Sequence, residues 1–369
     1  MNQKPLQISL LLASAVMVCG AGAIWSSKNR AVAALDDEKA LQQVVSDTER
    51  ENSRRALELL SRSTRADNQL TYSALSQTVA FIGGKSIASH AKITRAPRHL
   101  CIETLSGAEK GARSGYSQRW FWRQAVGQKM QPYAEVQLPA DAMAIKRLPL
   151  LSQNYRVSLG ETKTVDGRAA QAIELRPKHR IDGARGPARR LWIDQKSGLT
   201  LGIESFNCAL QPTTRSTLSQ LRIAPPIAPA TFQQPQAIFA SLSTQNWQGE
   251  ELGDDFRAAT QKTGFVPPKP TYLPPGFELD GYGVHRCLTT GTLQPAAFSR
   301  YCDGLNTLTV FAFKPANQNI AKNMRGGCNF GPGAMSSRED NGGRLVAMGD
   351  LPTKTLQRIL GSAHFESAR

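Results

Sequence analysis

The sequence has little of what enzymes and metal sites rely on. Its 369 residues include 6 Cys and 5 His, and no two cysteines form a C-x-x-C pair, which disfavours a thioredoxin-like redox motif and a zinc ribbon. No H-E-x-x-H or G-x-S-x-G motif occurs. Acidic residues are scattered through the strand-like regions, so paired-carboxylate hydrolysis has no candidate. We therefore expect a protein that is not an enzyme and that carries no metal or cofactor.

Long apolar runs are almost absent. The one such run, from Ile8 to Trp25, follows Lys4, carries no charge and contains the small-residue site Ala21-Gly22-Ala23. A basic start, an apolar middle and small residues are typical of a signal peptide. About 18 apolar residues can also just span a bilayer, so the alternative is an uncleaved signal anchor. We expect a periplasmic protein, or one anchored in the inner membrane that faces the periplasm.

Acidic residues are outnumbered by basic ones, 29 to 45, which gives a net charge of +16. Export removes nucleic acid as the partner of this charge and leaves anionic lipids, lipopolysaccharide phosphates or acidic proteins. The densest basic cluster is opposed only by Asp182. It consists of Lys178, Arg180, Arg185, Arg189 and Arg190. Two interpretations stay open, an anion-binding site or a solvated loop that keeps the protein soluble.

The cysteines predict disulfides, since exported proteins keep them oxidised. Cys287 and Cys302 flank a predicted hairpin, formed by 285–288 and 299–302, and are expected to bridge. Cys101 with Cys208 follows only by elimination, and Cys328 is left over.

Hydrophobic periodicity divides the chain into two folded parts. Helical spacing extends from about Asp36 to Thr64, and short runs rich in β-branched and aromatic residues follow up to Ile223. Up to about ten antiparallel strands with helix on one side form an α+β layout, a large curved sheet with helix packed on it. We divide the chain into a signal peptide or anchor (1–33), a first domain (34–224), a Pro-rich linker with a short helix (225–271) and a smaller α+β domain (272–369).

A cluster of aromatic residues offers a candidate ligand site. Trp120 and Trp122 share one face of a predicted strand, because side chains alternate along a strand. If that face is the concave one, Phe81 and Leu100 would complete an apolar pocket suited to an acyl chain. Packing of these side chains in the core is the competing explanation.

A series of short motifs, in a fixed order, is similar to the RseB/MucB family. The motifs are Asn154-Tyr155-Arg156-Val157, Val165-Asp166-Gly167-Arg168, Glu174-Leu175-Arg176-Pro177, Arg190-Leu191-Trp192-Ile193-Asp194, Ser197-Gly198-Leu199, Leu273-Pro274-Pro275-Gly276-Phe277, Asp303-Gly304-Leu305 and Val346-Ala347-Met348-Gly349-Asp350-Leu351-Pro352. The resemblance implies a first domain with the fold of the lipoprotein carrier LolA, an unclosed β-barrel capped by helices around an apolar cavity.

The resemblance also implies a partner. Proteins of this family are periplasmic regulators of the sigma-E envelope-stress response, and they bind the periplasmic segment of a single-pass membrane anti-sigma factor. Binding shields that factor from proteolysis until lipid or lipopolysaccharide releases it. The alternative function is a lipid or lipoprotein carrier of the LolA type.

Overall fold

The computed structural model describes residues 47–367 with short gaps. The gaps are 83, 108, 118–119, 125, 127–130, 136–139, 184–185, 233–248, 290–291, 315–325 and 331–332. The predicted signal segment and the start of the predicted first helix lie outside the described residues. Within the described part, no helix is both long enough and apolar enough to cross a bilayer.

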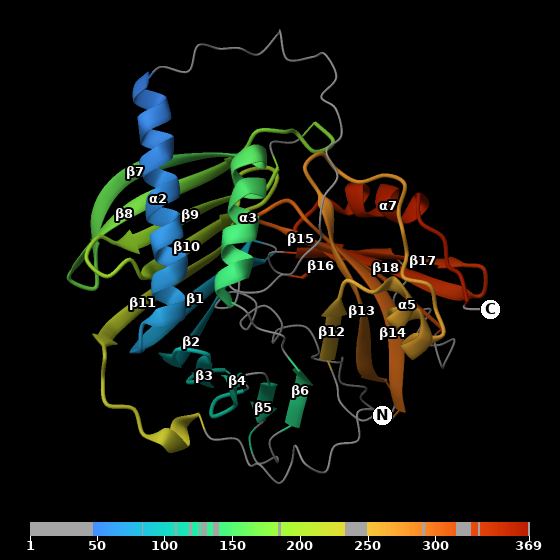
Figure 1. Cartoon of the computed structure of the whole chain (residues 1–369), viewed down its shortest axis with the longest axis horizontal. Coiled ribbons are helices and arrows are strands. Elements are labelled where there is room, and N and C mark those ends of the chain that lie inside the picture. The colour runs from blue at the N-terminus through green and yellow to red at the C-terminus, as the bar shows by residue number, and fades with distance from the viewer. Residues whose placement is uncertain are drawn as a thin grey trace.

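The first half of the chain forms an antiparallel sheet of 11 strands (Figure 1). The strands are β1 (Tyr72–Ile82), β2 (Lys85–Ala96), β3 (His99–Thr104), β4 (Arg113–Ser117), β5 (Trp120–Gln124), β6 (Gln131–Glu135), β7 (Tyr155–Val165), β8 (Arg168–Pro177), β9 (Ala188–Asp194), β10 (Thr200–Phe206) and β11 (Pro212–Ile223). Their order is β6-β5-β4-β3-β2-β1-β11-β10-β9-β8-β7, so β6 and β7 are the two ends of the sheet. The expected fold, an unclosed antiparallel sheet with helices packed on it, is confirmed.

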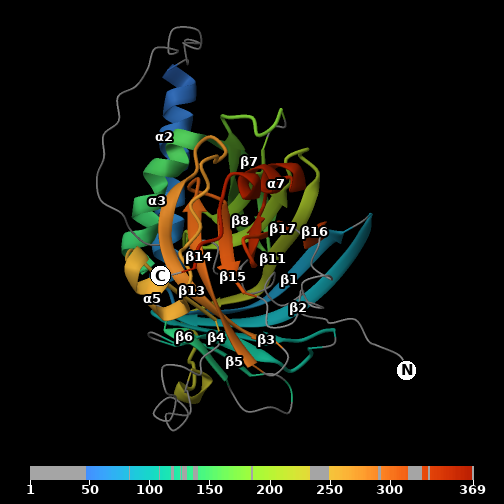
Figure 2. The ribbon, with the colours of Figure 1, turned by 90° about the vertical axis from the view of Figure 1, so that its right-hand side faces the viewer.

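Two helices, α2 (Asp47–Gln69) and α3 (Ala140–Asn154), cover one face of this sheet side by side (Figures 1 and 2). Apolar side chains of α2, among them Ala56 and Leu60, pack against Ile173 and Ile193 of the sheet. Such burial of an apolar stripe supplies most of the stability of a helix in a protein. We call the helix-covered side of the sheet its inner face and the opposite side its outer face.

The second half of the chain forms a separate sheet of 7 strands. Its strands are β12 (Gly249–Gly253), β13 (Glu278–Thr289), β14 (Thr292–Cys302), β15 (Thr307–Phe313), β16 (Gly326–Phe330), β17 (Gly333–Asp340) and β18 (Gly343–Gly349), in the order β12-β13-β14-β15-β18-β17-β16. The helix α7 (Thr353–Gly361) packs Leu356 and Ile359 on one face against Leu308 and Leu345. A short helix α5 (Phe256–Thr263) begins at Asp255, whose carboxylate accepts hydrogen bonds from the backbone N–H groups of the first turn.

Some elements differ from the sequence predictions. The segment expected to be a linker with a short helix does contain that helix, α5, but it also contains β12, which pairs with β13 as part of the second sheet. The sequence of residues 137–151, with Pro139 and Pro149, predicts a connection with a short helical stretch, but Ala140–Asn154 form the 15-residue helix α3. The hairpin predicted from 285–288 and 299–302 is much longer in the structure, because β13 extends from Glu278 to Thr289 and pairs with β14 over its whole length.

Candidate functional site

The register of the first sheet separates the aromatic residues expected to form one pocket. Trp122 lies opposite Gly115, which lies opposite Cys101, whereas Leu100 lies opposite Tyr116. Since neighbouring residues of a strand point to opposite faces, Leu100 and Trp122 lie on different faces of the sheet. Leu100 belongs to a buried cluster with Ala66 of α2 and so lies on the inner face.

Phe81 shares the outer face with Trp122 but lies at the other end of its strand. The row of Trp122 and Cys101 meets β1 at Ser73, and Phe81 lies eight residues further on (73 to 81), about 26 Å at roughly 3.3 Å per residue. The side chain of Trp120 lies outside the described part of the chain. The four residues are therefore not brought together into one concave pocket.

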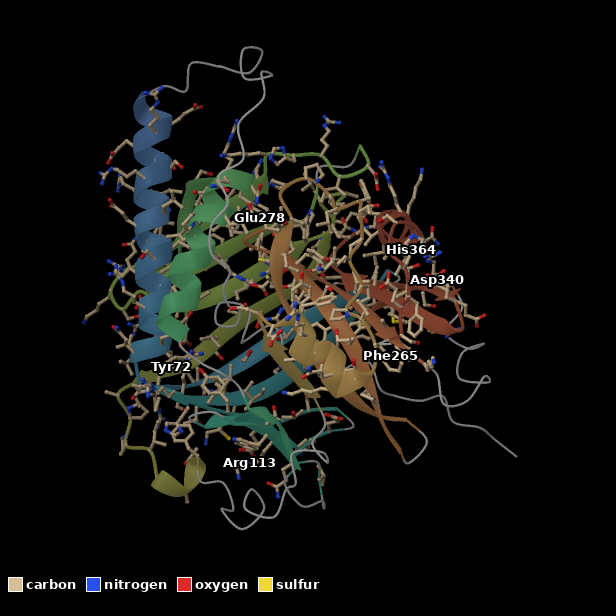
Figure 3. The ribbon with its side chains drawn as sticks, turned by 45° about the vertical axis from the view of Figure 1, so that its right-hand side comes forward. Tyr72, Arg113, Phe265, Glu278, Asp340 and His364 are labelled. Atoms are coloured by element: carbon tan, nitrogen blue, oxygen red, sulfur yellow. The ribbon has the colours of Figure 1, made fainter. Side chains whose placement is uncertain are left out.

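The packing of Trp122 agrees with the competing explanation, a core role. Its side chain is 1% exposed, and the guanidinium of Arg113 lies 5.8 Å from the ring centroid. Arg113 in turn donates a hydrogen bond of 3.1 Å to the backbone oxygen of Thr231, the last residue of the 3-10 turn η1 (Pro229–Thr231). Figure 3 marks Arg113 on this part of the sheet. The chain that follows β11 thus packs back on the outer face near Trp122.

The predicted basic cluster does not converge on one site. Lys178 donates to the backbone oxygen of Ser152 at 2.8 Å, and Arg180 donates to that of Gly183 at 3.4 Å. Arg185 lies outside the described residues. The remaining two residues, Arg189 and Arg190, are neighbours in β9 and point to opposite faces.

Arg189 pairs with Asp350 of the second sheet at 3.7 Å. Arg190 pairs on the outer face with Glu174 at 2.8 Å and with Glu204 at 3.5 Å.

The loop that carries this cluster holds the two halves of the molecule together. Ile181 is buried in the core between α7 and the second sheet. Asp182 accepts a hydrogen bond from Thr355 Oγ1 in the first turn of α7 and lies 3.5 Å from Arg358 Nη1. A carboxylate at a helix N-terminus is favoured by the helix dipole. No local sequence pattern indicates that the basic loop contacts α7, because only the fold brings the two segments together.

The two predicted disulfides are wrong, because Cys101, Cys208 and Cys302 are free and buried. The hairpin places Cys287 opposite Gln294. Cys302 lies eight residues beyond Gln294 (294 to 302), about 26 Å at roughly 3.3 Å per residue. Disulfides need Cα atoms within about 7 Å of each other. Cys101 in β3 and Cys208 beyond β10 are also kept apart, since β2, β1 and β11 lie between those strands.

A buried polar network joins the first sheet to the second. Tyr155, the first residue of β7, donates through its hydroxyl to Asp303 Oδ2 at 2.6 Å and accepts from Asn306 Nδ2 at 2.7 Å. These side chains are 2%, 4% and 2% exposed. Burial, and then the Asp303 carboxylate, raise the pKa of Tyr155 well above its usual value. Asn154 adds hydrogen bonds from its Nδ2 to the backbone oxygens of Gly276 at 2.9 Å and Asp303 at 3.0 Å. We call these residues the junction network.

Two glycines allow the backbones to approach this closely. Gly304 has φ +95°, and a Cβ there would lie 2.4 Å from the backbone nitrogen of Leu151 in α3. Gly276 has φ +86°, and its Cβ would lie 2.4 Å from Asn154 Oδ1. Both positions therefore require glycine for two reasons: the backbone is left-handed, and there is no space for a Cβ atom.

Charged residues of α3 and the second sheet continue the junction. Arg147 of α3 lies 3.7 Å from Asp280 Oδ2, which also accepts from Arg300 Nε at 2.8 Å. Burial raises the pKa of Asp280, against the effect of Arg300 and Arg147, and burial lowers the pKa of Arg147. Figure 3 labels Glu278 at the start of β13, two residues before Asp280. The junction is therefore an extended surface in which charged groups are taken out of water.

A second polar cluster lies on the inner face under the end of α2. Asp67 accepts from Thr200 Oγ1 at 3.5 Å, and Arg95 donates to Asn68 Oδ1 at 3.0 Å. Burial raises the pKa of Asp67 to about 6, although Arg95 opposes this change. Tyr72 is buried beside these residues, where α2 meets β1 (Figure 3). The cluster attaches the end of the helix to the sheet.

Sequence reasoning did not assign the junction residues a role, although several of them stand in the motifs that carry the family resemblance. Asn154 and Tyr155 open one motif, Asp303 and Gly304 open another, and Gly276 ends a Pro-Pro-Gly turn. The motifs lie far apart in the sequence, and the fold brings them to one place. Among the residues that the structure describes, no group of His, Cys, Asp and Glu could hold a metal ion.

Comparisons with known proteins agree with this architecture. Residues 55–236 match the family model of the MucB/RseB N-terminal domain. The structure of the Pseudomonas aeruginosa MucA/MucB complex matches 85% of this chain and 99% of its own chain, with a TM-score of 0.57 at 20% identity. A structure of MucB with MucA(peri) matches 85% of this chain and 100% of its own, with a TM-score of 0.55 at 22% identity. MucB alone gives a TM-score of 0.53 at 20% identity. No curated protein matches the sequence.

Proposed function

Because this chain contains a MucB/RseB N-terminal domain at residues 55–236, we propose that it is a periplasmic regulator that binds the periplasmic part of a single-pass anti-sigma factor. In this role it controls an envelope-stress response of the sigma-E type. The observation that carries the proposal is the extent of the likeness to MucB, which covers 85% of this chain, whereas the family domain ends at residue 236. The chain thus has the MucB architecture in both halves, and MucB has been solved with MucA(peri).

The junction network supports a binding role in which the two halves act as one body. Tyr155, Asp303 and Asn306 are buried and saturate one another with hydrogen bonds. A partner that contacts both halves loses less conformational entropy when their relative orientation is already fixed. We therefore expect the complex to weaken when the junction is disrupted, even where the partner does not touch it.

The proposal includes release of the partner by lipid or lipopolysaccharide, as the family resemblance implies. The location of such a ligand is not identified by Trp122, Phe81 and Leu100, which lie apart. For the same reason no observation favours the alternative function, a LolA-type carrier of lipids or lipoproteins.

The test is an affinity purification of the tagged full chain from native envelopes after mild crosslinking, with proteins and lipids identified by mass spectrometry. We expect one single-pass membrane protein with a cytoplasmic sigma-binding part, and we expect added lipopolysaccharide to reduce its recovery. Gly304→Val, which disrupts the junction, should recover less of it than Gly84→Val, which changes a glycine of similar φ with nothing near its Cβ. Recovery of lipoproteins or acyl lipids without such a protein would support the carrier function instead.

A further inference from the structure

Positive charge gathers on the outer face of the first sheet, over β7 to β11. Register places the side chains in rows: Arg156 lies opposite Arg176, and Glu174, Arg190, Glu204 and Arg215 follow one another across four strands. Lys163 lies on the same face, with its amine 3.5 Å from the ring centroid of Trp192. We call this set of Arg156, Lys163, Arg176, Arg190, Arg215, Glu174 and Glu204 the outer basic face.

The carboxylates of the outer basic face do not neutralise its cations. Glu174 accepts from Arg176 at 2.6 Å and from Arg190 at 2.8 Å, and Glu204 accepts from Arg215 at 2.9 Å. Two carboxylates are thus shared by three guanidinium groups. Even when Glu161 of β7, whose charge acts on Lys163, is counted as well, five cations stand against three carboxylates.

One feature of this face opposes stability. Arg156 and Arg176 are directly opposite in β7 and β8, and like charges in that relation destabilise a sheet. Arg156 is exposed, and within the described part of the chain it makes no ion pair. The side chain of Arg176 is 64% exposed although it pairs with Glu174. An anion that bridges both guanidinium groups would remove this repulsion.

The arrangement fits carboxylates held by a protein chain. Guanidinium groups bind carboxylates through two parallel hydrogen bonds, and those of Arg176, Arg190 and Arg215 are already oriented by Glu174 and Glu204. Surfaces that bind membranes combine cations with apolar side chains that insert. In the described part of the chain, the large exposed apolar side chains are Ile87, Val126 and Ile223. The first two lie outside β7 to β11, and Ile223, at the end of β11, lies opposite Tyr72 of the inner face.

From these observations we infer that the outer basic face binds an acidic segment of a protein partner, with Arg156 and Arg176 as its main contacts. The inference depends on the face alone and holds whether or not the partner is an anti-sigma factor. Displacement of the segment by salt follows from the exposure of the cations, since salt screens exposed charges with a Debye length of about 10 Å at 0.1 M ionic strength.

The test measures binding of a fluorescein-labelled peptide of alternating Glu and Ser to the full chain by fluorescence anisotropy. The double variant Arg156→Ser/Arg176→Ser is compared with Lys85→Ser/Lys110→Ser. The second variant removes the same charge from two exposed residues away from this face, Lys85 at the start of β2 and Lys110 in the loop after β3. We expect the first variant to weaken binding about tenfold, or roughly 1.4 kcal/mol, and the second less than about twofold. Thermal unfolding of both variants confirms that they fold, and removal of the like-charged pair should not lower the midpoint.

Two results would overturn the inference. Equal weakening by both variants would mean that the peptide responds to net charge and not to this face. Loss of binding to phosphatidylglycerol vesicles in Arg156→Ser/Arg176→Ser, with peptide binding unchanged, would mean that the face binds a membrane.

Discussion

The hydroxyl of Tyr155 is the most direct means of testing how the two halves are joined. Tyr155→Phe keeps the ring and removes one oxygen, which donates to Asp303 and accepts from Asn306. The Asp303 carboxylate then keeps its hydrogen bonds from the backbone of Leu305 at 2.9 Å and Asn306 at 2.6 Å but loses the one from Tyr155. A hydrogen bond to a charged group contributes about 1.5–3 kcal/mol, so we expect the free energy of unfolding to fall by about 2 kcal/mol.

The assay is urea unfolding followed by fluorescence and far-UV circular dichroism, and Tyr282→Phe is the matched control. The ring of Tyr282 packs against Phe256 at 5.2 Å between centroids, and its hydroxyl makes no hydrogen bond among the described residues. We expect the control to change the unfolding free energy by less than about 0.5 kcal/mol. If Tyr155→Phe costs no more than Tyr282→Phe, the hydroxyl does not hold the halves together and the description of the junction is wrong.

Three further changes test other parts of the structure. In urea unfolding, Gly304→Ala should destabilise the protein by about 1–3 kcal/mol more than Gly84→Ala. Both glycines have positive φ, but only at Gly304 would the new Cβ clash with the backbone of Leu151. Equal losses of stability would contradict the close approach of the two backbones. The pKa of Asp67, raised to about 6, makes the native state bind its proton more tightly than the unfolded state. Protonated Asp67 therefore stabilises the native state fully below about pH 4, and this stabilisation is lost as the pH rises to about 6. The free energy of unfolding should fall by at most about 3 kcal/mol over this range, because the side chain is partly exposed. In Asp67→Asn the free energy of unfolding should not show this fall between about pH 4 and 6. If the stability of both proteins changes with pH in the same way, Asp67 is not the source of the pH dependence. Burial raises the pKa of Cys208 and Cys302 to about 11, so both thiols should resist Ellman's reagent in the native protein. Both should react once the protein is unfolded in guanidinium without reductant. Thiols that stay unreactive in guanidinium would mean that a disulfide is present.

Local patterns predicted the first sheet well, because its information lies in neighbouring residues. Alternation and turn residues predict strands at 70–82, 86–94 and 98–105, within a few residues of the observed bounds of β1, β2 and β3. Pro149 misled the assignment of α3, since a proline inside a helix removes a hydrogen bond but does not prevent a helix that is buried against α2 and the sheet.

The candidate site was predicted less well, because it depends on which strands pair. Trp122 and Leu100 belong to adjacent parts of the sheet, but the parity of the register sends them to opposite faces. Cys287 and Cys302 were expected to face each other across a short hairpin. In the structure β13 and β14 pair along their whole length, which places Cys287 opposite Gln294 and Cys302 opposite Glu278. The local sequence does not show how many residues of two neighbouring strands pair with each other. The family resemblance succeeded where composition did not, since its motifs contain Tyr155 and Asp303, which meet only in the folded chain.

The central claim, that the chain binds the periplasmic part of an anti-sigma factor, is tested most directly by calorimetric titration. The purified mature protein is titrated with the periplasmic segment of each single-pass membrane protein that has a cytoplasmic sigma-binding part in the same host. We expect saturable binding to one of these segments, with a Kd of about 1 μM or tighter, and weaker binding by Gly304→Val than by Gly84→Val. Absence of binding to every such segment, by a protein that unfolds cooperatively and is therefore folded, would contradict it.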